Sequence, residues 1–175
     1  MKDVELKLIS ELMKNGRKSD RELAKAVGVS QPTVTRVRGK LEKEGVIKEY
    51  AMIPDFSKLG FEIAAVTFLR FKKELSNEES NKLRRYSREI EKKKSEAILL
   101  AMNGMGLGYN RIFISFHKNY ASYVKAINEV RTMPYVDPSH VESFMINLVD
   151  EPHFQTLTLS AIANYLLKTK EEKKE

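Results

Sequence analysis

The chain of 175 residues contains no cysteine and no tryptophan, and it has only three histidines. Without cysteine there is no disulfide, no thiolate nucleophile and no cysteine-ligated zinc, which fits a reducing compartment. The histidines His117, His140 and His153 are scattered without the spacing of metal ligands. No nucleophile–base pair and no paired carboxylates stand out. The sequence therefore predicts no catalytic site, no metal site and no cofactor.

Long apolar runs are also missing. None reaches the roughly 18–20 residues that a helix needs to cross a bilayer. The N-terminal residues 1–5 have the pattern of a helix start and not that of a signal peptide. We therefore expect a soluble, cytoplasmic protein without a membrane partner. Hydrophobic residues make up 42% of the chain, which is enough for a packed core in one domain or two small ones.

Positive charge is in excess, with a formal net charge of +7. Residues 1–50 carry 12 Lys/Arg and 8 Asp/Glu, whereas residues 51–150 carry 15 and 12 over twice the length. Residues 151–175 carry 4 of each sign. The basic charge is thus densest in the first third, as expected of a segment that meets phosphate, although a solvated surface explains such a charge equally well.

Residues 1–44 have the pattern of three helices around a tight turn. A broad apolar stripe marks the first helix, made of Val4, Leu6, Leu8, Ile9, Leu12 and Met13. The capping box Ser19–Glu22 opens a short second helix, and Gly28 allows a left-handed turn after it. Ser30 is a good N-cap for a third helix. This order predicts a helix-turn-helix.

The third predicted helix has two different faces. Its inward positions are apolar, namely Val34, Val37 and Leu41. Its outward positions carry an amide, hydroxyls and a guanidinium, the groups that read base edges in a major groove. We predict base-edge contacts from Gln31, Thr33, Thr35 and Arg36. We predict phosphate contacts from Arg17, Lys18, Ser30, Arg38 and Lys40. Thr33 and Arg38 lie on the flanks of the helix, so their two roles could be exchanged. An ordinary amphipathic surface helix remains an alternative at this point.

The rest of the chain changes in character. A β-branched run at residues 46–53 predicts a strand that forms a wing or a link. From residue 61 onward the predicted order is β-α-β-β-α-β, a ferredoxin-like unit. Its predicted strands are residues 61–71, 97–102, 111–117 and 141–149, with helices capped at Ser76 and Asn119, and a further helix from about Thr158. Such a sheet has helices for only one face, which predicts that a second copy covers the other.

Several motifs together carry a family resemblance. They are Glu22-Leu23-Ala24, Val27-Gly28-Val29-Ser30, Thr33-Val34-Thr35-Arg36-Val37, Leu41-Glu42-Lys43-Glu44-Gly45-Val46-Ile47 and Leu59-Gly60. With the βαββαβ order behind them, residues 1–150 resemble the leucine-responsive regulator/AsnC (feast/famine) family of transcription factors.

The resemblance implies an α+β protein, with an N-terminal winged helix-turn-helix followed by a ferredoxin-like effector domain. The expected domains are residues 1–50 for DNA binding, a linker strand at 51–60, an effector and dimerisation domain at 61–150, and a C-terminal helix and charged tail at 151–175. The implied partners are double-stranded DNA, further copies of the chain in a homodimer or larger assembly, and a small-molecule effector.

The glycine-rich turn at residues 103–110 is the candidate effector site. The family typically has Gly-x-Tyr-Asp here, whereas this chain has Asn110 in place of the acid. Glycine lets a ligand approach backbone amides, while a neutral amide attracts an ammonium group less than an acid does. We expect weak amino-acid binding or a different effector, unless the turn is simply a hairpin loop. The candidate residues are Asn103, Gly104, Gly106, Gly108, Tyr109 and Asn110.

Two other functions are weighed beside a transcriptional regulator. An architectural nucleoid-type protein would use a basic helix carrying Lys82, Arg84, Arg85, Arg88, Lys92, Lys93 and Lys94, although a solvated helix face explains the same charges. Siroheme decarboxylases share the two-domain plan but resemble a pattern with His-Asn-Tyr and Trp-Phe motifs. This chain has no tryptophan, and it reads His117-Lys118-Asn119-Tyr120. We therefore expect a protein that is not an enzyme.

Overall fold

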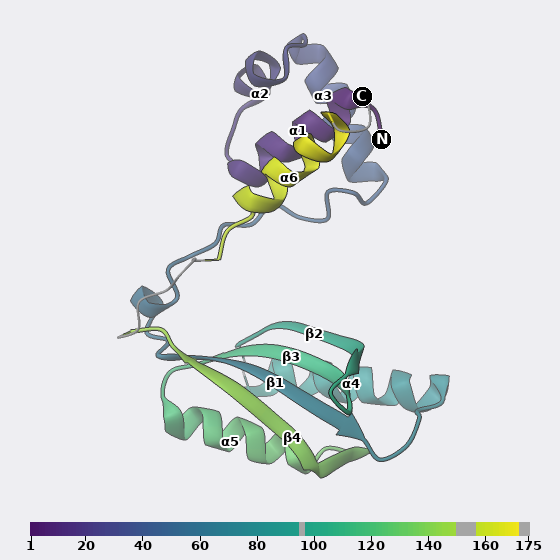
Figure 1. Ribbon diagram of the computed structural model, residues 1–175, viewed down its shortest axis with the longest axis vertical. Coiled ribbons are helices and arrows are strands. Elements are labelled where there is room, and N and C mark those ends of the chain that lie inside the picture. Colours follow the sequence, from purple (N-terminus) through teal and green to yellow (C-terminus); the bar gives the residue numbers. More distant parts are fainter. Residues whose placement is uncertain (95–96, 150–156, 172–175) are drawn as a thin grey trace. The chain divides into compact units, whose positions relative to one another are not determined.

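The computed structural model describes residues 1–94, 97–149 and 157–171 (Figure 1). The chain divides into two compact units, one of residues 1–54 and 153–175 and the other of residues 55–152. No helix in the described ranges is long and apolar enough to cross a membrane.

The first unit contains the predicted helix-turn-helix. Its helices are α1 (Asp3–Lys14), α2 (Asp20–Val27) and α3 (Gln31–Lys43). The apolar face of each helix meets the other two in one buried cluster of Leu8, Leu23, Ala24, Val27, Val34, Val37 and Leu41. The period of the apolar residues thus places all three helices around a common core.

A fourth helix, α6 (Ser160–Glu171), belongs to the same unit. It packs along α1, as the yellow and purple ribbons in Figure 1 show. Ser10 of α1 and Ala163 of α6 are both fully buried, and Ser10 Oγ donates a hydrogen bond of 2.9 Å to the carbonyl of Ala163. The sequence left open whether this helix packs on the sheet of its own chain or on a partner, and the structure places it on α1 instead.

The second unit has the predicted βαββαβ order. Its elements are β1 (Ile63–Phe71), α4 (Asn77–Lys94), β2 (Ala97–Gly106), β3 (Tyr109–His117), α5 (Tyr120–Arg131) and β4 (Val136–Asn147). The four strands form one antiparallel sheet in the order β2-β3-β1-β4. Both the order and the ferredoxin-like class are as predicted.

One face of this sheet carries the helices. Leu69 of β1 and Val141 of β4 pack against Ile127 and Val130 of α5, and Figure 1 shows α4 and α5 on the same side of the sheet. Side chains alternate along a strand, so the neighbouring positions point to the other face. We call this the open face, made of Val66, Phe68, Leu100, Met102, Ile112, Ile114 and Phe144.

The open face is apolar and partly exposed. Phe144 is 68% exposed and Met102 is 53% exposed, while Phe68 and Ile112 are half-buried. Large contiguous apolar patches are unusual on monomers.

The predicted strand at residues 46–53 and the linker strand at 51–60 are wrong. Residues 46–56 form no helix or strand, and a short 3-10 helix, η1 (Ser57–Leu59), follows. The amides of Val46 and Ile47 donate to the Leu41 carbonyl, at 2.9 and 3.2 Å, and close the end of α3. The β-branched residues misled the prediction because their propensity counts only when another strand is beside them.

Two strand boundaries also differ from the prediction. β4 begins at Val136 and not at residue 141, although Pro138 lies inside it, because β4 is an edge strand that tolerates proline. β2 and β3 run much further into the segment at 103–110. Only Leu107 and Gly108, with φ of 52° and 82°, form the turn. A two-residue hairpin of this kind needs positive φ at both positions.

Candidate DNA-binding interface

The start of α2 is fixed by the predicted capping box. The amide of Glu22 donates to Ser19 Oγ at 3.3 Å, and the amide of Ser19 donates to Glu22 Oε2 at 2.7 Å. The Ser19 hydroxyl also donates to Glu22 Oε2 at 2.7 Å, and this bond together with the one from the Ser19 amide holds the pKa of Glu22 below its ordinary value. At the other end Gly28 adopts φ of 78°, and its amide donates to the Ala24 carbonyl at 2.9 Å. The turn before α3 is therefore set by local chemistry.

The start of α3 is capped by Ser30. Its Oγ accepts from the Thr33 amide at 3.4 Å and lies 2.9 Å from the Thr33 hydroxyl. Pro32 lies in the first turn of α3. Its missing N–H costs little there, because the amides of the first turn have no hydrogen-bond partner within the helix. The inward residues of α3 are buried, whereas Gln31, Thr35 and Arg36 are exposed. The helix thus presents a polar outer face on a rigid base.

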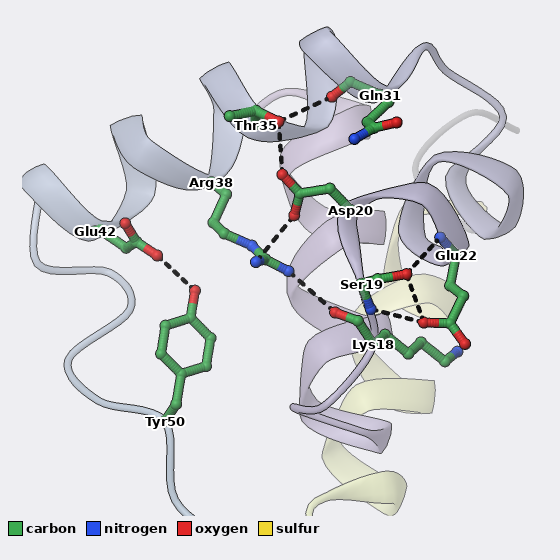
Figure 2. A network of polar contacts seen from close by, with 9 residues as sticks. All are labelled: Lys18, Ser19, Asp20, Glu22, Gln31, Thr35, Arg38, Glu42 and Tyr50. Atoms are coloured by element: carbon green, nitrogen blue, oxygen red, sulfur yellow. Dashed lines mark hydrogen bonds and ion pairs between the residues drawn. The ribbon is translucent and has the colours of Figure 1, made fainter.

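Asp20, the first residue of α2, ties α3 to α2 (Figure 2). One carboxylate oxygen, Oδ2, accepts from Thr35 Oγ1 at 2.6 Å. The other, Oδ1, forms an ion pair of 2.9 Å with Arg38 Nη1. Arg38 Nη2 also donates to the Lys18 carbonyl at 3.3 Å. Because the Asp20 and Arg38 side chains are mostly shielded from solvent, this contact constrains α3 more than an exposed pair would.

A second ion pair ties α3 to α1. Lys40 Nζ lies 2.6 Å from Glu5 Oε1, and Glu5 also accepts from the Lys2 amide at 2.6 Å. The hydrogen bond from Lys40 holds the pKa of Glu5 below its ordinary value, and Glu5 raises the pKa of Lys40. Lys18 pairs in the same way with Glu11 of α1 and lowers the pKa of that carboxyl.

The segment after α3 folds back on the helix through Tyr50. Its hydroxyl donates to Glu42 Oε1 at 2.7 Å, and the Arg38 guanidinium lies 5.9 Å from the ring centre. Burial, together with the Glu42 hydrogen bond, raises the pKa of Tyr50 to about 12. Sequence reasoning missed Asp20, Glu5 and Tyr50, because these contacts join residues whose separations follow no helical or strand period.

The predicted DNA-contacting residues fall into two groups. In the described part of the chain the side chains of Arg17, Gln31 and Arg36 have no hydrogen bond or ion pair. The other predicted residues have partners inside the unit, namely Lys18, Ser30, Thr33, Thr35, Arg38 and Lys40. Arg36 and Gln31 are therefore the available base-reading groups, and all nine roles stay predictions.

The candidate effector turn is a tight hairpin. The side chain of Asn110 accepts from the Phe71 amide at 3.1 Å, and that of Asn103 accepts from Arg111 Nε at 3.2 Å. Both amides are thus engaged with the sheet. A hydrogen bond to Glu142 raises the pKa of Tyr109. Gly106 and Gly108 lie at the turn with positive φ, which their lack of a Cβ permits.

The basic residues of α4 are the basis of the architectural alternative. Those at its start and middle are exposed, namely Lys82, Arg84, Arg85 and Arg88. Lys82 pairs with Glu78 at 2.8 Å, one turn away. The side chains of the predicted basic residues Lys92, Lys93 and Lys94 are not among those that the structure describes.

Comparisons with known proteins agree with this geometry. A family model described as winged helix-turn-helix DNA-binding matches residues 1–48. The HTH-type transcriptional regulator LrpC of Bacillus subtilis is 38% identical over 63 residues, which are 36% of this chain and 44% of that protein. The leucine-responsive regulatory protein of Rhizobium meliloti is 36% identical over 69 residues, 39% and 44% of the two chains. The matches thus span less than half of these relatives.

Solved structures share the fold of both units. LrpC of B. subtilis has a TM-score of 0.67 at 23% identity, over 89% of this chain and 99% of that one. AsnC of E. coli has a TM-score of 0.65 at 18% identity, over 90% and 97%. A transcriptional regulator of Neisseria meningitidis in complex with L-Met has a TM-score of 0.69 at 18% identity, over 93% and 99%.

The fold and the interface together define a class of protein, in which a helix-turn-helix unit is joined to a βαββαβ unit. Within that class, the first third of the chain is similar in sequence to LrpC and to the leucine-responsive regulatory protein, and the fold along the chain is similar to the folds of LrpC and AsnC.

The paired carboxylates make a prediction about acid stability. The pKa values of Glu5 and Glu11 lie below the ordinary value of 4.5 in the folded state. Their contribution to the free energy of unfolding is therefore complete above about pH 4.5 and is lost as the pH falls through the lower folded-state values. We expect the free energy of unfolding of Glu5→Gln to fall less than that of the wild type as the pH is lowered. Urea unfolding from pH 7 to pH 3 measures it.

The matched control is Glu49→Gln, because Glu49 is exposed and has no ion pair among the described residues. An equal pH dependence in the two variants would contradict the assignment.

Proposed function

We propose that this protein is a sequence-specific DNA-binding transcriptional regulator that works as a homodimer or larger assembly. The observation that carries the proposal is α3, a helix held by Asp20 and Glu5 at its sides. Its outer face exposes Arg36 and Gln31, whose side chains have no partner among residues 1–94, 97–149 and 157–171. A helix presented in this way fits a major groove. The relatives that are named transcriptional regulators support the same function.

The outer face of α3 suggests specific roles. Arg36 suits a bidentate contact with guanine, and Gln31 suits one with adenine. The Thr35 hydroxyl already donates a hydrogen bond to Asp20. The methyl group of Thr35 therefore remains for an apolar contact with a thymine methyl. Arg17, whose side chain has no partner among the described residues, is the proposed phosphate contact. Arg38 and Lys40 serve first as anchors of α3, since carboxylates already hold them.

The second unit is proposed as the dimerisation and effector unit. Its open face is an apolar sheet surface, and a second copy would cover it with the same surface in a two-fold arrangement. Such a pair would place two copies of α3 on a pseudo-palindromic site. A small molecule acts by binding one assembly better than another. One fold neighbour was solved with L-Met, which makes amino acids the first effectors to test.

The role of Arg36 is tested by substitution. We expect Arg36→Ala to remove most of the preference for the operator over scrambled DNA, because a bidentate arginine–guanine contact is worth about 1–3 kcal/mol. Arg36→Lys keeps the charge but not the planar fork, so it should lose preference as well. Competition binding at fixed salt measures the ratio of the two affinities.

Arg17→Ala serves as the comparison. It should weaken binding to all sequences alike and lower the salt slope by about one. If Arg36→Ala discriminates like the wild type, the role is wrong. Equal affinities for operator and scrambled DNA in the wild type would favour the architectural alternative.

The open face makes a prediction about assembly. We expect Phe144→Asp to convert the protein to monomers, because it puts a charge into the apolar open face. The matched control is Tyr120→Asp, since Tyr120 is similarly exposed, at 61%, but lies at the start of α5. Light scattering at micromolar concentration measures the mass. A Phe144→Asp protein that keeps the wild-type mass would contradict this interface.

The hairpin makes a prediction about effectors. We expect Asn110→Asp to bind amino acids about tenfold more tightly than the wild type, because a carboxylate attracts the ammonium group while still accepting from the Phe71 amide. Calorimetry with leucine, methionine and asparagine measures the affinity. Asn128→Asp is the control, because Asn128 is exposed on α5 and lies outside the hairpin. No gain at Asn110, or an equal gain at both positions, would leave the hairpin a simple turn.

A further inference from the structure

Helix α1 has a second apolar face that the helix-turn-helix does not use. Leu8 and its neighbours one turn away point into the core of α1, α2 and α3. Leu6, Ser10 and Met13 lie at spacings of four and three residues, and so share another side of the helix. Ser10 is completely buried there, while Leu6 and Met13 are half-buried. A three-helix unit alone would leave this side open.

Helix α6 fits this second face closely. Its small residue Ala163 is fully buried, and the hydroxyl of Ser10 donates to the Ala163 carbonyl at 2.9 Å. Small side chains at the contact let two helix backbones approach, and the hydrogen bond satisfies a hydroxyl that burial would otherwise penalise. The outward residues Ile162 and Tyr165 are 52% and 64% exposed. The contact is therefore specific to one side of α6.

The course of the chain gives this contact a consequence. The chain leaves the first unit after Pro54, forms the second unit and returns to the first with α6. Two chain connections thus join the units, one that follows α3 in the sequence and one that follows β4. Helix α1 in turn holds α3 through the ion pair between Glu5 and Lys40.

We propose that α6 is a fourth helix of the DNA-binding unit, docked on α1 of its own chain, and that its docking supports the DNA-binding state of α3. The effector unit is then an insertion whose two ends both act on the helix-turn-helix. When α6 is docked, it shields one face of α1 from solvent. Loss of this contact destabilises α1, the helix that carries Glu5. Only the DNA-binding part of this proposal rests on the proposed function.

The first test compares two substitutions on adjacent positions of α6. Ala163→Asp places a charge in the contact, whereas Ile162→Asp places the same charge on the exposed side. We expect amide hydrogen exchange in α1 to rise at least tenfold in Ala163→Asp and to stay at the wild-type level in Ile162→Asp. Equal exchange in the two variants would overturn the docking. This measurement needs no DNA, so it is independent of the proposed function.

The second test uses the absence of native cysteine. A Ser10→Cys/Ala163→Cys protein is oxidised and run on a denaturing gel, beside a Ser10→Cys/Ile162→Cys control. We expect a crosslink within one chain in the first protein and much less crosslinking in the control. A crosslinked dimer would mean that α6 docks on a second copy, and the absence of any crosslink would mean that it does not dock. Either result overturns the proposal.

The third measurement addresses the support of α3. We expect Ala163→Asp to bind operator DNA at least several-fold more weakly than Ile162→Asp. If hydrogen exchange in α1 rises while DNA affinity stays unchanged, α6 docks without supporting α3, and that part of the proposal fails. If even the wild type binds no DNA, the proposed function fails, while the exchange and crosslinking results still decide the docking.

Discussion

The carboxylate of Asp20 holds α3 against α2, and the proposed DNA-binding surface depends on this contact. One side chain holds both Thr35 and Arg38 at the start of α2 (Figure 2). A buried apolar face alone would let α3 slide or rotate on its neighbours, because hydrophobic contact has no direction. Hydrogen bonds and an ion pair at fixed positions remove that freedom. The side chain of Arg36 is exposed on this helix and has no partner in the described part of the chain.

Charge is used here for two different purposes. Most of the predicted phosphate-binding cations turn out to be paired with Glu5, Glu11 or Asp20. A cation held by a partly buried carboxylate builds the scaffold, and a cation without a partner is the one available to a polyanion. Net charge therefore points to the first unit, whereas the structure shows which of its cations are already paired.

Sequence reasoning succeeded where the signal is local. Caps at Ser19 and Ser30, the glycine at position 28 and the apolar period place α2 and α3 closely. It failed where the outcome depends on partners far away in the chain. Residues 46–53 have strand propensity but no neighbouring strand, and Tyr50 is held by a side chain of α3 instead. The contact between Ser10 and Ala163 joins positions 153 residues apart, which no periodicity reveals. The broad apolar stripe of α1 was the only sign of it.

The measurement that tests the account most directly is selection of DNA sites from a random library by the full chain at physiological salt. The account predicts a pseudo-palindromic motif with half-sites one helical turn or a multiple of it apart, each with a guanine whose enrichment disappears in Arg36→Ala. Binding without any enriched motif, or an identical motif in Arg36→Ala, would contradict the claim that the outer face of α3 reads the sequence of DNA.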